Sequence, residues 1–263
     1  PDSSTWETLL ERPAIDTSSL NSIVMNVFNS VRSKGDEAVS EFTRRFDNVD
    51  LKRFEVTKEE IAAAASSVST DLKEAISIAA GNIKRFHSSQ TTKEEVIETM
   101  PGVKCWRKSV GIDKVGLYIP GGSAPLFSTV LMLVIPAKIA GCGEIVLCTP
   151  PESDGSVNPV ILYTANLVGA NRIFKIGGVQ AISAMTLGTD QVPKVNKIFG
   201  PGNQYVTAAK LIAQNYGVAI DMPAGPSEVM VYSDESGDPA FIAADLLAQA
   251  EHGGDSQVLC VST

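Results

Sequence analysis

The sequence predicts an α/β fold: a Rossmann-like, doubly wound parallel sheet, preceded by a helical segment and followed by the start of a second α/β half. After residue 100, short apolar runs alternate with helical stretches of ten or more residues. That alternation is typical of parallel strands joined by right-handed crossovers. Before residue 100 the chain is charged and has helical spacing, and glycine-rich turns later separate several strands from the helices that follow.

The composition is that of a globular protein. The chain has 263 residues, 44% apolar and 20% charged, which is enough to build a sizeable core. A net charge of −8 argues against nucleic-acid binding, which usually needs a basic face. The four cysteines have no C-x-x-C spacing, so we expect reduced, mostly buried thiols and a cytosol-like compartment. No membrane span is expected, because the most apolar run, 129–140, is too short for one.

The first part of the chain is expected to be helical. Residues 19–46 have helical spacing, and their predicted apolar face consists of Ile23, Val24, Val27, Phe28 and Val31. Thr57 and Glu60 form the pattern of a capping box ahead of an alanine-rich helix. A further helix is expected over 71–87 and ends at His87, where the helix dipole favours a histidine without any further role.

The second part is expected to alternate strands and helices. Strands are predicted at 115–119, 144–148, 172–176, 197–199, 218–221, 228–232 and 257–261. Helices are predicted over 131–140 and 157–167, after GGVQA, from GPGN to about 216, and after Asp238-Pro239, where proline takes the first helical position. Domain boundaries are expected near residue 117 and in the proline- and glycine-rich link 222–226.

Three glycine turns are expected at the edge of the sheet where ligands bind: PGGSAP (120–125), GGVQ (177–180) and GPGN (200–203). Glycine lets the backbone approach a ligand, and a helix N-terminus favours a phosphate. None is G-x-G-x-x-G or a P-loop, and each alone is more often structural. Together they favour a nucleotide or another phosphate-bearing ligand, with Tyr118, Gln180 and Asn203 able to hydrogen-bond it.

The stretch QAEHGGDSQ (249–257) contains the second histidine of the chain. Gln249 and His252 are three residues apart, on one helix face, where two side chains can bind one metal ion. A lone histidine before a glycine C-cap, however, more often compensates the helix dipole. Spacing alone therefore favours an ordinary helix end.

Six stretches, in order along the chain, resemble histidinol dehydrogenase: VGLYIPGG (115–122), PAKIAGCGEIVLCTPP (136–151), KIGGVQAI (175–182), KIFGPGNQYVTAAK (197–210), DMPAGPSEV (221–229) and LLAQAEHGGDSQ (246–257). The resemblance implies NAD- and zinc-dependent oxidation of L-histidinol to L-histidine through L-histidinaldehyde, the last steps of histidine biosynthesis. It also implies a homodimer with shared active sites, in the cytoplasm or, in a plant, the plastid.

The same resemblance assigns roles to individual residues. Tyr118, Gln180 and Asn203 would contact NAD, Ser227 the substrate, and Gln249 and His252 both Zn2+ and the substrate. The expected domains are an N-terminal arm (1–20), a helical first part of domain 1 (21–117), a Rossmann-like NAD-binding domain (118–226) and a truncated return to domain 1 (227–263).

The sequence also departs from the family pattern. The family's catalytic Glu-His pair and its two other zinc ligands would lie beyond Thr263, so we expect an N-terminal portion that is inactive alone. Gly254 stands where many members have proline. The alternatives are a nucleotide- or phosphate-binding α/β module without catalytic activity, a different enzyme class, or a folded interaction module.

Overall fold

The computed structural model describes residues 3–11, 17–122, 125–170, 172–223, 227–251 and 256–263. Its contacts divide the chain into two compact units. The larger is Ser18–Met222, and the smaller combines Pro1–Thr17 with Pro223–Thr263. The division into four domains expected from the sequence stays a prediction.

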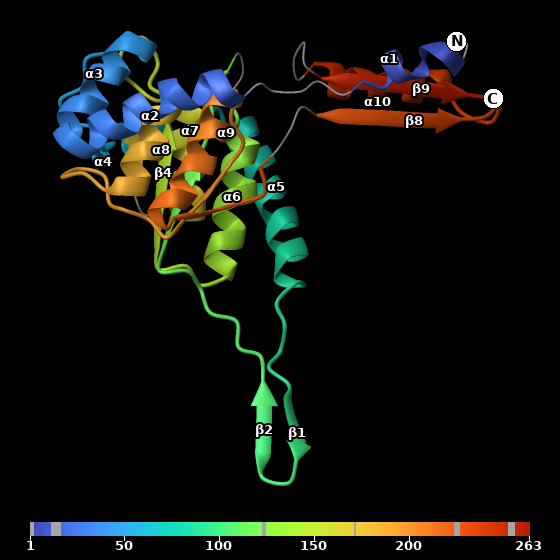
Figure 1. Cartoon of the computed structure of the whole chain (residues 1–263), viewed down its shortest axis with the longest axis horizontal. Helices are drawn as coiled ribbons and strands as arrows, with labels where there is room; N and C mark the ends of the chain where they lie inside the picture. The colour runs from blue at the N-terminus through green and yellow to red at the C-terminus, as the bar shows by residue number, and fades with distance from the viewer. Residues whose placement is uncertain (1–2, 12–16, 123–124, 171, 224–226, 252–255) are drawn as a thin grey trace. The chain divides into compact units, whose positions relative to one another are not determined.

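A five-stranded parallel sheet is the centre of the larger unit (Figure 1). Its strands lie in the spatial order β5 (Arg172–Lys175), β4 (Glu144–Thr149), β3 (Lys114–Tyr118), β6 (Lys197–Phe199) and β7 (Ala219–Ile220). The chain adds β4 and β5 on one side of β3, then returns and adds β6 and β7 on the other. The direction of winding therefore reverses between β3 and β6, which confirms the predicted doubly wound sheet.

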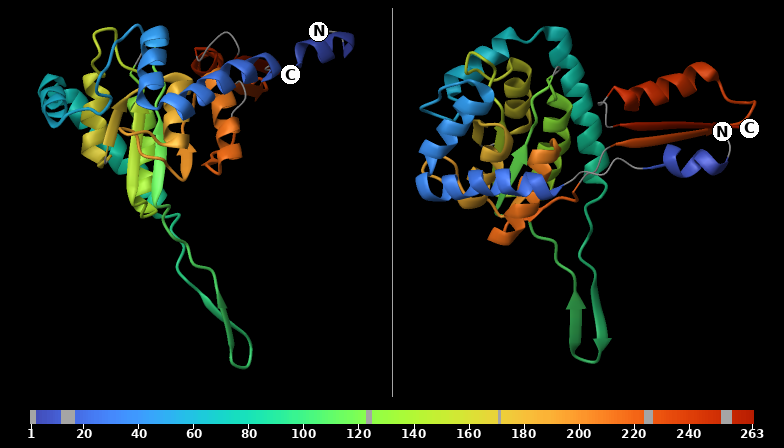
Figure 2. Two further views of the ribbon diagram at one scale, coloured as in Figure 1. Left: turned by 60° about the vertical axis from the view of Figure 1, so that its left-hand side comes forward. Right: turned by 45° about the horizontal axis from the view of Figure 1, so that its top comes forward.

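Helices cover both faces of this sheet (Figure 2). The crossovers α6 (Phe127–Ile139) and α7 (Pro159–Val168) pack on one face, and α8 (Gly178–Leu187) and α9 (Gln204–Ala213) on the other. A short 3-10 turn, Gln214–Tyr216, follows α9. Residues 179–186 of α8 are all buried, because α3 and α9 pack against this helix as well as the sheet.

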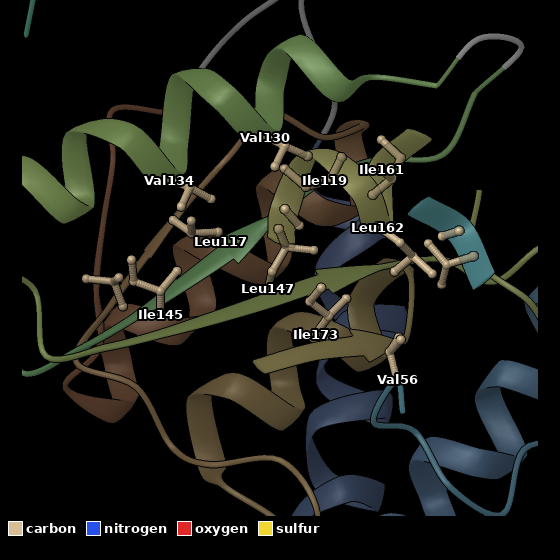
Figure 3. Packing of buried hydrophobic residues seen from close by; sticks show 14 residues of the cluster. Val56, Leu117, Ile119, Val130, Val134, Ile145, Leu147, Ile161, Leu162 and Ile173 are labelled. Carbon is tan, nitrogen blue, oxygen red and sulfur yellow. The ribbon is translucent and has the colours of Figure 1, made fainter. Parts of the chain in front are cut away.

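The main core lies between the sheet and the α6–α7 layer (Figure 3). Leu117 and Ile119 from β3 and the turn after it, Leu147 from β4, and Ile173 from β5 are at most 3% exposed. They pack with Val130 and Val134 of α6 and with Ile161 and Leu162 of α7. Strands with apolar residues on both faces are expected in a parallel sheet covered by helices on each side.

Four helices precede the sheet: α2 (Thr17–Lys34), α3 (Asp36–Asp47), α4 (Lys58–Ser67) and α5 (Thr70–Ser88). The continuous helical spacing over 19–46 covers two helices, because Gly35 adopts φ +56°, which breaks the helix. Val24, Val27, Phe28 and Val31 are buried as predicted. Ile23 is wrongly assigned to the buried face, since it is 47% exposed.

The predicted capping box at Thr57 is present and also ties α4 to the sheet. The Thr57 hydroxyl accepts from the Glu60 amide, and Glu60 Oε2 accepts from the Thr57 amide at 2.7 Å. The other Glu60 oxygen pairs with Lys175 Nζ at 2.8 Å, at the end of β5. Glu55 binds Arg172 through two hydrogen bonds of 2.8 and 2.9 Å, so the segment around it covers the outer edge of β5.

A hairpin between α5 and β3 was not predicted from the sequence. It consists of β1 (Val96–Met100) and β2 (Val103–Trp106), which pair antiparallel and project away from the sheet (Figure 1). Pro101-Gly102 between the strands is a recognised turn signal. Every residue of both strands is exposed, which explains why no buried periodicity marked them.

The smaller unit has a strand–helix–strand motif of its own, as predicted. β8 (Glu228–Ser233) and β9 (Gln257–Ser262) pair in parallel, and α10 (Pro239–Ala250) connects them. Asp238 caps α10 by accepting from the Ala240 amide, with Pro239 at the first helical position. The first residues of the chain, a 3-10 turn Ser3–Thr5 and α1 (Trp6–Leu9), belong to this unit.

Two further expectations concern the whole chain. Cys148 is buried and Cys142 half-buried, but Cys105 and Cys260 are exposed, so "mostly buried" is wrong for the thiols. Both exposed cysteines lie on strands, β2 and β9, that are not covered on both faces in the described part of the chain. Across the described residues, none of the helices combines the length and the apolar character that crossing a bilayer requires.

We expect Thr57→Ala to lower the free energy of unfolding by about 1 kcal/mol, the typical cost of losing an N-cap side chain. The measurement is urea unfolding followed by circular dichroism. Ser66→Ala is the control, because this exposed hydroxyl bonds only the Ala62 carbonyl within the same helix. An equal loss in both variants would contradict a special contribution of the capping box.

Candidate functional site

The reversal of the sheet places the end of β3 beside the turn that follows β6. Tyr118 is the last residue of β3, and Gly200 opens the GPGN turn. Gly200 adopts φ +128°, and a Cβ at this position would lie 2.1 Å from the Tyr118 carbonyl oxygen. Only glycine fits here, so the turn lies directly on the end of β3. In open α/β sheets, such a reversal point is where ligands bind.

An ion pair between a buried lysine and a partly buried aspartate holds the Gly200 peptide groups. Asp221 Oδ2 accepts from the Gly200 amide at 2.8 Å, and Lys210 Nζ donates to the Gly200 carbonyl at 2.8 Å. Lys210 and Asp221 also form an ion pair with each other. Neither residue is among the site residues predicted from the sequence. Asp221 follows β7 at the ligand-binding edge and could have been noticed, whereas nothing distinguishes Lys210 from other helix lysines.

Asn203 ends the turn and caps α9. Its side-chain oxygen accepts from the Tyr205 and Val206 amides, each at 3.1 Å. The residue is exposed, as are Pro201 and Gly202 before it. The first turn of α9 therefore presents its positive end to solvent, beside a glycine turn fixed on the sheet. This arrangement can accept an anionic group.

Tyr118 and Gln180 lie at the same edge, but their side chains contact protein. Tyr118 is 4% exposed, and its hydroxyl accepts from the Gly178 amide at 3.0 Å. Burial raises the Tyr118 pKa to about 12. Gln180 is 1% exposed and donates through Nε2 to Asp47 Oδ2 at 3.1 Å. Its Oε1 is buried and has no hydrogen-bond partner within the described chain.

Asp47, the last residue of α3, is a polar member of this edge that was not predicted from the sequence. Burial raises its pKa to about 6, although the Gln180 hydrogen bond acts in the opposite direction. The Asp47 charge in turn contributes to the raised pKa of Tyr118. Asp47 comes from the helical segment, far along the chain from the glycine turns, and no local motif marks it.

The other predicted site residues belong to the smaller unit. Ser227 is exposed immediately before β8, and its carbonyl accepts from the Gln257 amide at 3.1 Å. Gln249 is half-buried in the last turn of α10, and its Nε2 is buried with no partner in the described part of the chain. His252 lies outside the described residues.

The metal-binding capacity of the described residues is limited. They contain no group of three or more histidine, cysteine, aspartate or glutamate side chains placed to hold a metal ion. Zinc sites in proteins generally use three or four such ligands. Of the two residues predicted to bind zinc, the structure describes only Gln249, whose carboxamide oxygen can supply one donor.

We expect Asp47→Asn to stabilise the chain above about pH 6. Burial opposes the ionisation of the Asp47 carboxylate, and the variant lacks this group. The folded-state pKa lies above the unfolded value of 3.8, so wild-type stability falls as the pH rises from about 4 through 6. Asparagine can still accept from Gln180. Thermal melting of both proteins should give equal midpoints near pH 4 and a higher one for the variant at pH 7. A larger gain at pH 4 than at pH 7 would contradict this reasoning.

Comparison with known proteins identifies the family of the chain. Residues 10–263 match the family model of histidinol dehydrogenase. Histidinol dehydrogenases from Bacteroides thetaiotaomicron and Salmonella typhimurium are 59% and 51% identical over 263 and 257 residues, and "Histidinol dehydrogenase, chloroplastic" from Arabidopsis thaliana is 53% identical over 261. These matches cover 100%, 97% and 98% of this chain, in that order. They cover 61%, 58% and 56% of the relatives.

The fold agrees with this match. The crystal structure of histidinol dehydrogenase from Elizabethkingia anophelis superposes with a TM-score of 0.95 at 56% identity. It covers 100% of this chain, which corresponds to 61% of that protein's chain. The chain thus spans about three fifths of the relatives it matches. The sheet order, the glycine turns and the nearly complete family match lead to one conclusion: the chain belongs to the histidinol dehydrogenase family.

Proposed function

We propose that this chain contributes the nucleotide-binding part of a histidinol dehydrogenase, an oxidoreductase of histidine biosynthesis. The proposed reaction oxidises L-histidinol to L-histidine through L-histidinaldehyde, with NAD+ as electron acceptor and Zn2+ at the active site. The observation that carries the proposal is the glycine turn at 200–203, which exposes residues 201–203 and is fixed at the reversal point of a sheet in a chain of this family.

The pyrophosphate of NAD+ is assigned to the GPGN turn. The exposed N-terminus of α9 and the peptide groups around Gly202 supply the electrostatic attraction that an anion needs. Asn203 caps that helix and would border the nucleotide. NAD+, when bound, supplies the hydride-accepting carbon, and the residues of this chain position it.

Tyr118 and Gln180 complete the proposed NAD contacts. The unpartnered Oε1 of Gln180 is a buried acceptor that a donor such as a ribose hydroxyl or a carboxamide could satisfy. Tyr118 is bonded to Gly178, so contact with NAD+ would require the phenol to share or exchange this partner. The high pKa of Tyr118 keeps the phenol neutral, which suits a hydrogen-bonding role rather than proton transfer.

Ser227, Gln249 and His252 are the proposed substrate contacts, and Gln249 and His252 the proposed zinc ligands. The orphaned carboxamide nitrogen of Gln249 is compatible with a side chain oriented by a group outside the described residues. These two residues would supply part of the three or four ligands that a protein zinc site uses. The family resemblance assigns no catalytic acid or base to the 263 residues.

The remaining proposals concern partners and compartment. We infer a homodimer that shares its active sites, as the family resemblance implies. Among the relatives, the Arabidopsis protein is named as chloroplastic. For this chain, the cytoplasm, or the plastid in a plant, stays the prediction from sequence.

We expect the chain to bind NAD+ in isothermal titration calorimetry, and ADP-ribose with it, because both carry a pyrophosphate between an adenosine and a second ribose. Inorganic phosphate and GDP serve as controls. Selective binding of NAD+ supports the dehydrogenase role. Equal binding of all four ligands would favour the alternative, a general phosphate-binding α/β module.

We expect the 263-residue chain alone to produce no NADH from histidinol, NAD+ and Zn2+, because it lacks counterparts of the proposed acid-base pair. NADH absorbance measures this directly, with a histidinol dehydrogenase of full family length as the positive control. Sustained NADH production by the chain would show that residues within it perform the proton transfers.

A further inference from the structure

The Lys210–Asp221 ion pair makes contacts that go beyond pairing two charges. Lys210 donates to the Gly200 carbonyl, and Asp221 accepts from the Gly200 amide, so the pair holds both peptide groups of one glycine. The two residues come from different elements: Lys210 lies in the last turn of α9, and Asp221 follows β7. They meet at Gly200, whose backbone lies against the carboxyl end of β3.

The burial of Lys210 makes these contacts costly to lose. Its side chain is only 7% exposed, and that of Asp221 is 29% exposed. A buried ammonium is unfavourable unless both a counter-charge and hydrogen-bond acceptors surround it. The Asp221 carboxylate and the Gly200 carbonyl supply these. A buried ion pair adds little net stability compared with apolar residues. We therefore attribute to the Lys210–Asp221 pair the selection of one backbone conformation of the turn.

In the described part of the chain, side-chain hydrogen bonds hold the turn at its two ends. Pro201 has no amide hydrogen to donate, and Gly202 leaves its backbone free of side-chain constraints. At its far end, the Asn203 cap attaches the turn to α9. The turn is thus anchored at Gly200 by the ion pair and at Asn203 by the cap, with the two exposed residues between these anchors.

We propose that Lys210 and Asp221 are a positioning pair, which holds the 200–203 turn in the conformation that accepts the pyrophosphate of the nucleotide. Neither side chain touches the ligand. Lys210 also neutralises Asp221, so that this carboxylate does not repel an anion at the adjacent turn. The inference rests on the proposed function, because it takes the turn to be the nucleotide site.

The chain contains a matched control for this pair. Lys175 and Glu60 form a lysine–carboxylate pair at 2.8 Å, also at the end of a strand of the same sheet. The exposed fractions are similar: 12% for the Lys175 side chain and 33% for that of Glu60. This pair joins α4 to β5 but bonds no backbone group of a glycine turn. It therefore tests the effect of losing a comparable ion pair without disturbing the 200–203 turn.

The experiment measures NAD+ and ADP-ribose affinity by calorimetry for the unaltered chain, Lys210→Met, Asp221→Asn and Lys175→Met. Thermal melting without ligand gives the loss of stability for each variant. We expect Lys210→Met to lower the affinity for both ligands by about tenfold or more, because both carry the pyrophosphate. Asp221→Asn keeps an acceptor for the Gly200 amide and should weaken binding less. Lys175→Met should lower the melting temperature but change affinity by less than about twofold.

The outcomes separate the two proposals. If the unaltered chain binds NAD+ and the variants Lys210→Met and Asp221→Asn bind it equally well, the positioning role is overturned. The proposed function then stays intact. Equal weakening in Lys210→Met and Lys175→Met would also overturn it, because general destabilisation would then explain both. No NAD+ binding by the unaltered chain would overturn the proposed function and the positioning role together. If Lys210→Met does not fold, the milder Asp221→Asn decides.

Discussion

The contact between the Gly200 backbone and the Tyr118 carbonyl is the constraint on which the rest of the site depends. It closes the reversal of the sheet between β3 and β6, where no side chain has room. This contact fixes the direction of the 200–203 turn, and the turn leads directly into the first residue of α9. Asn203 then caps α9 at this edge, and Asp221 reaches the same edge because it follows β7, which runs parallel to β6.

A second polar cluster, formed by Asp47, Gln180 and Tyr118, differs in chemistry from the turn beside it. The turn exposes residues 201–203 beside a helix N-terminus, whereas Tyr118 and Gln180 are buried, and Gln180 Oε1 has no partner among the described residues. Burial raises the pKa of both ionisable members, so Asp47 and Tyr118 resist taking up charge. One side of the edge is therefore suited to an anion, and the other to neutral hydrogen-bonding groups. A dinucleotide, which combines both kinds of group, matches that division.

Local sequence was a good guide wherever one element could be recognised alone. The Thr57–Glu60 capping box, Pro239 after the Asp238 cap and the alternation of strands with helices were all predicted correctly. The break at Gly35 and the β1–β2 hairpin were not. Helical spacing continues across a single glycine, and an exposed hairpin has no buried face to impose a period on its residues.

The sequence by itself determined the fold class, the place of the glycine turns and the family, because each depends on residues close together along the chain. Only the tertiary structure decided the partners of those residues. Asp47 meets Gln180 across 133 residues of chain, and Lys210 of α9 meets Asp221 only because β7 returns to the edge where the 200–203 turn lies. A titratable side chain acquires its role from the charges and burial around it. Those surroundings exist only after strands from different parts of the sequence have come together in one sheet.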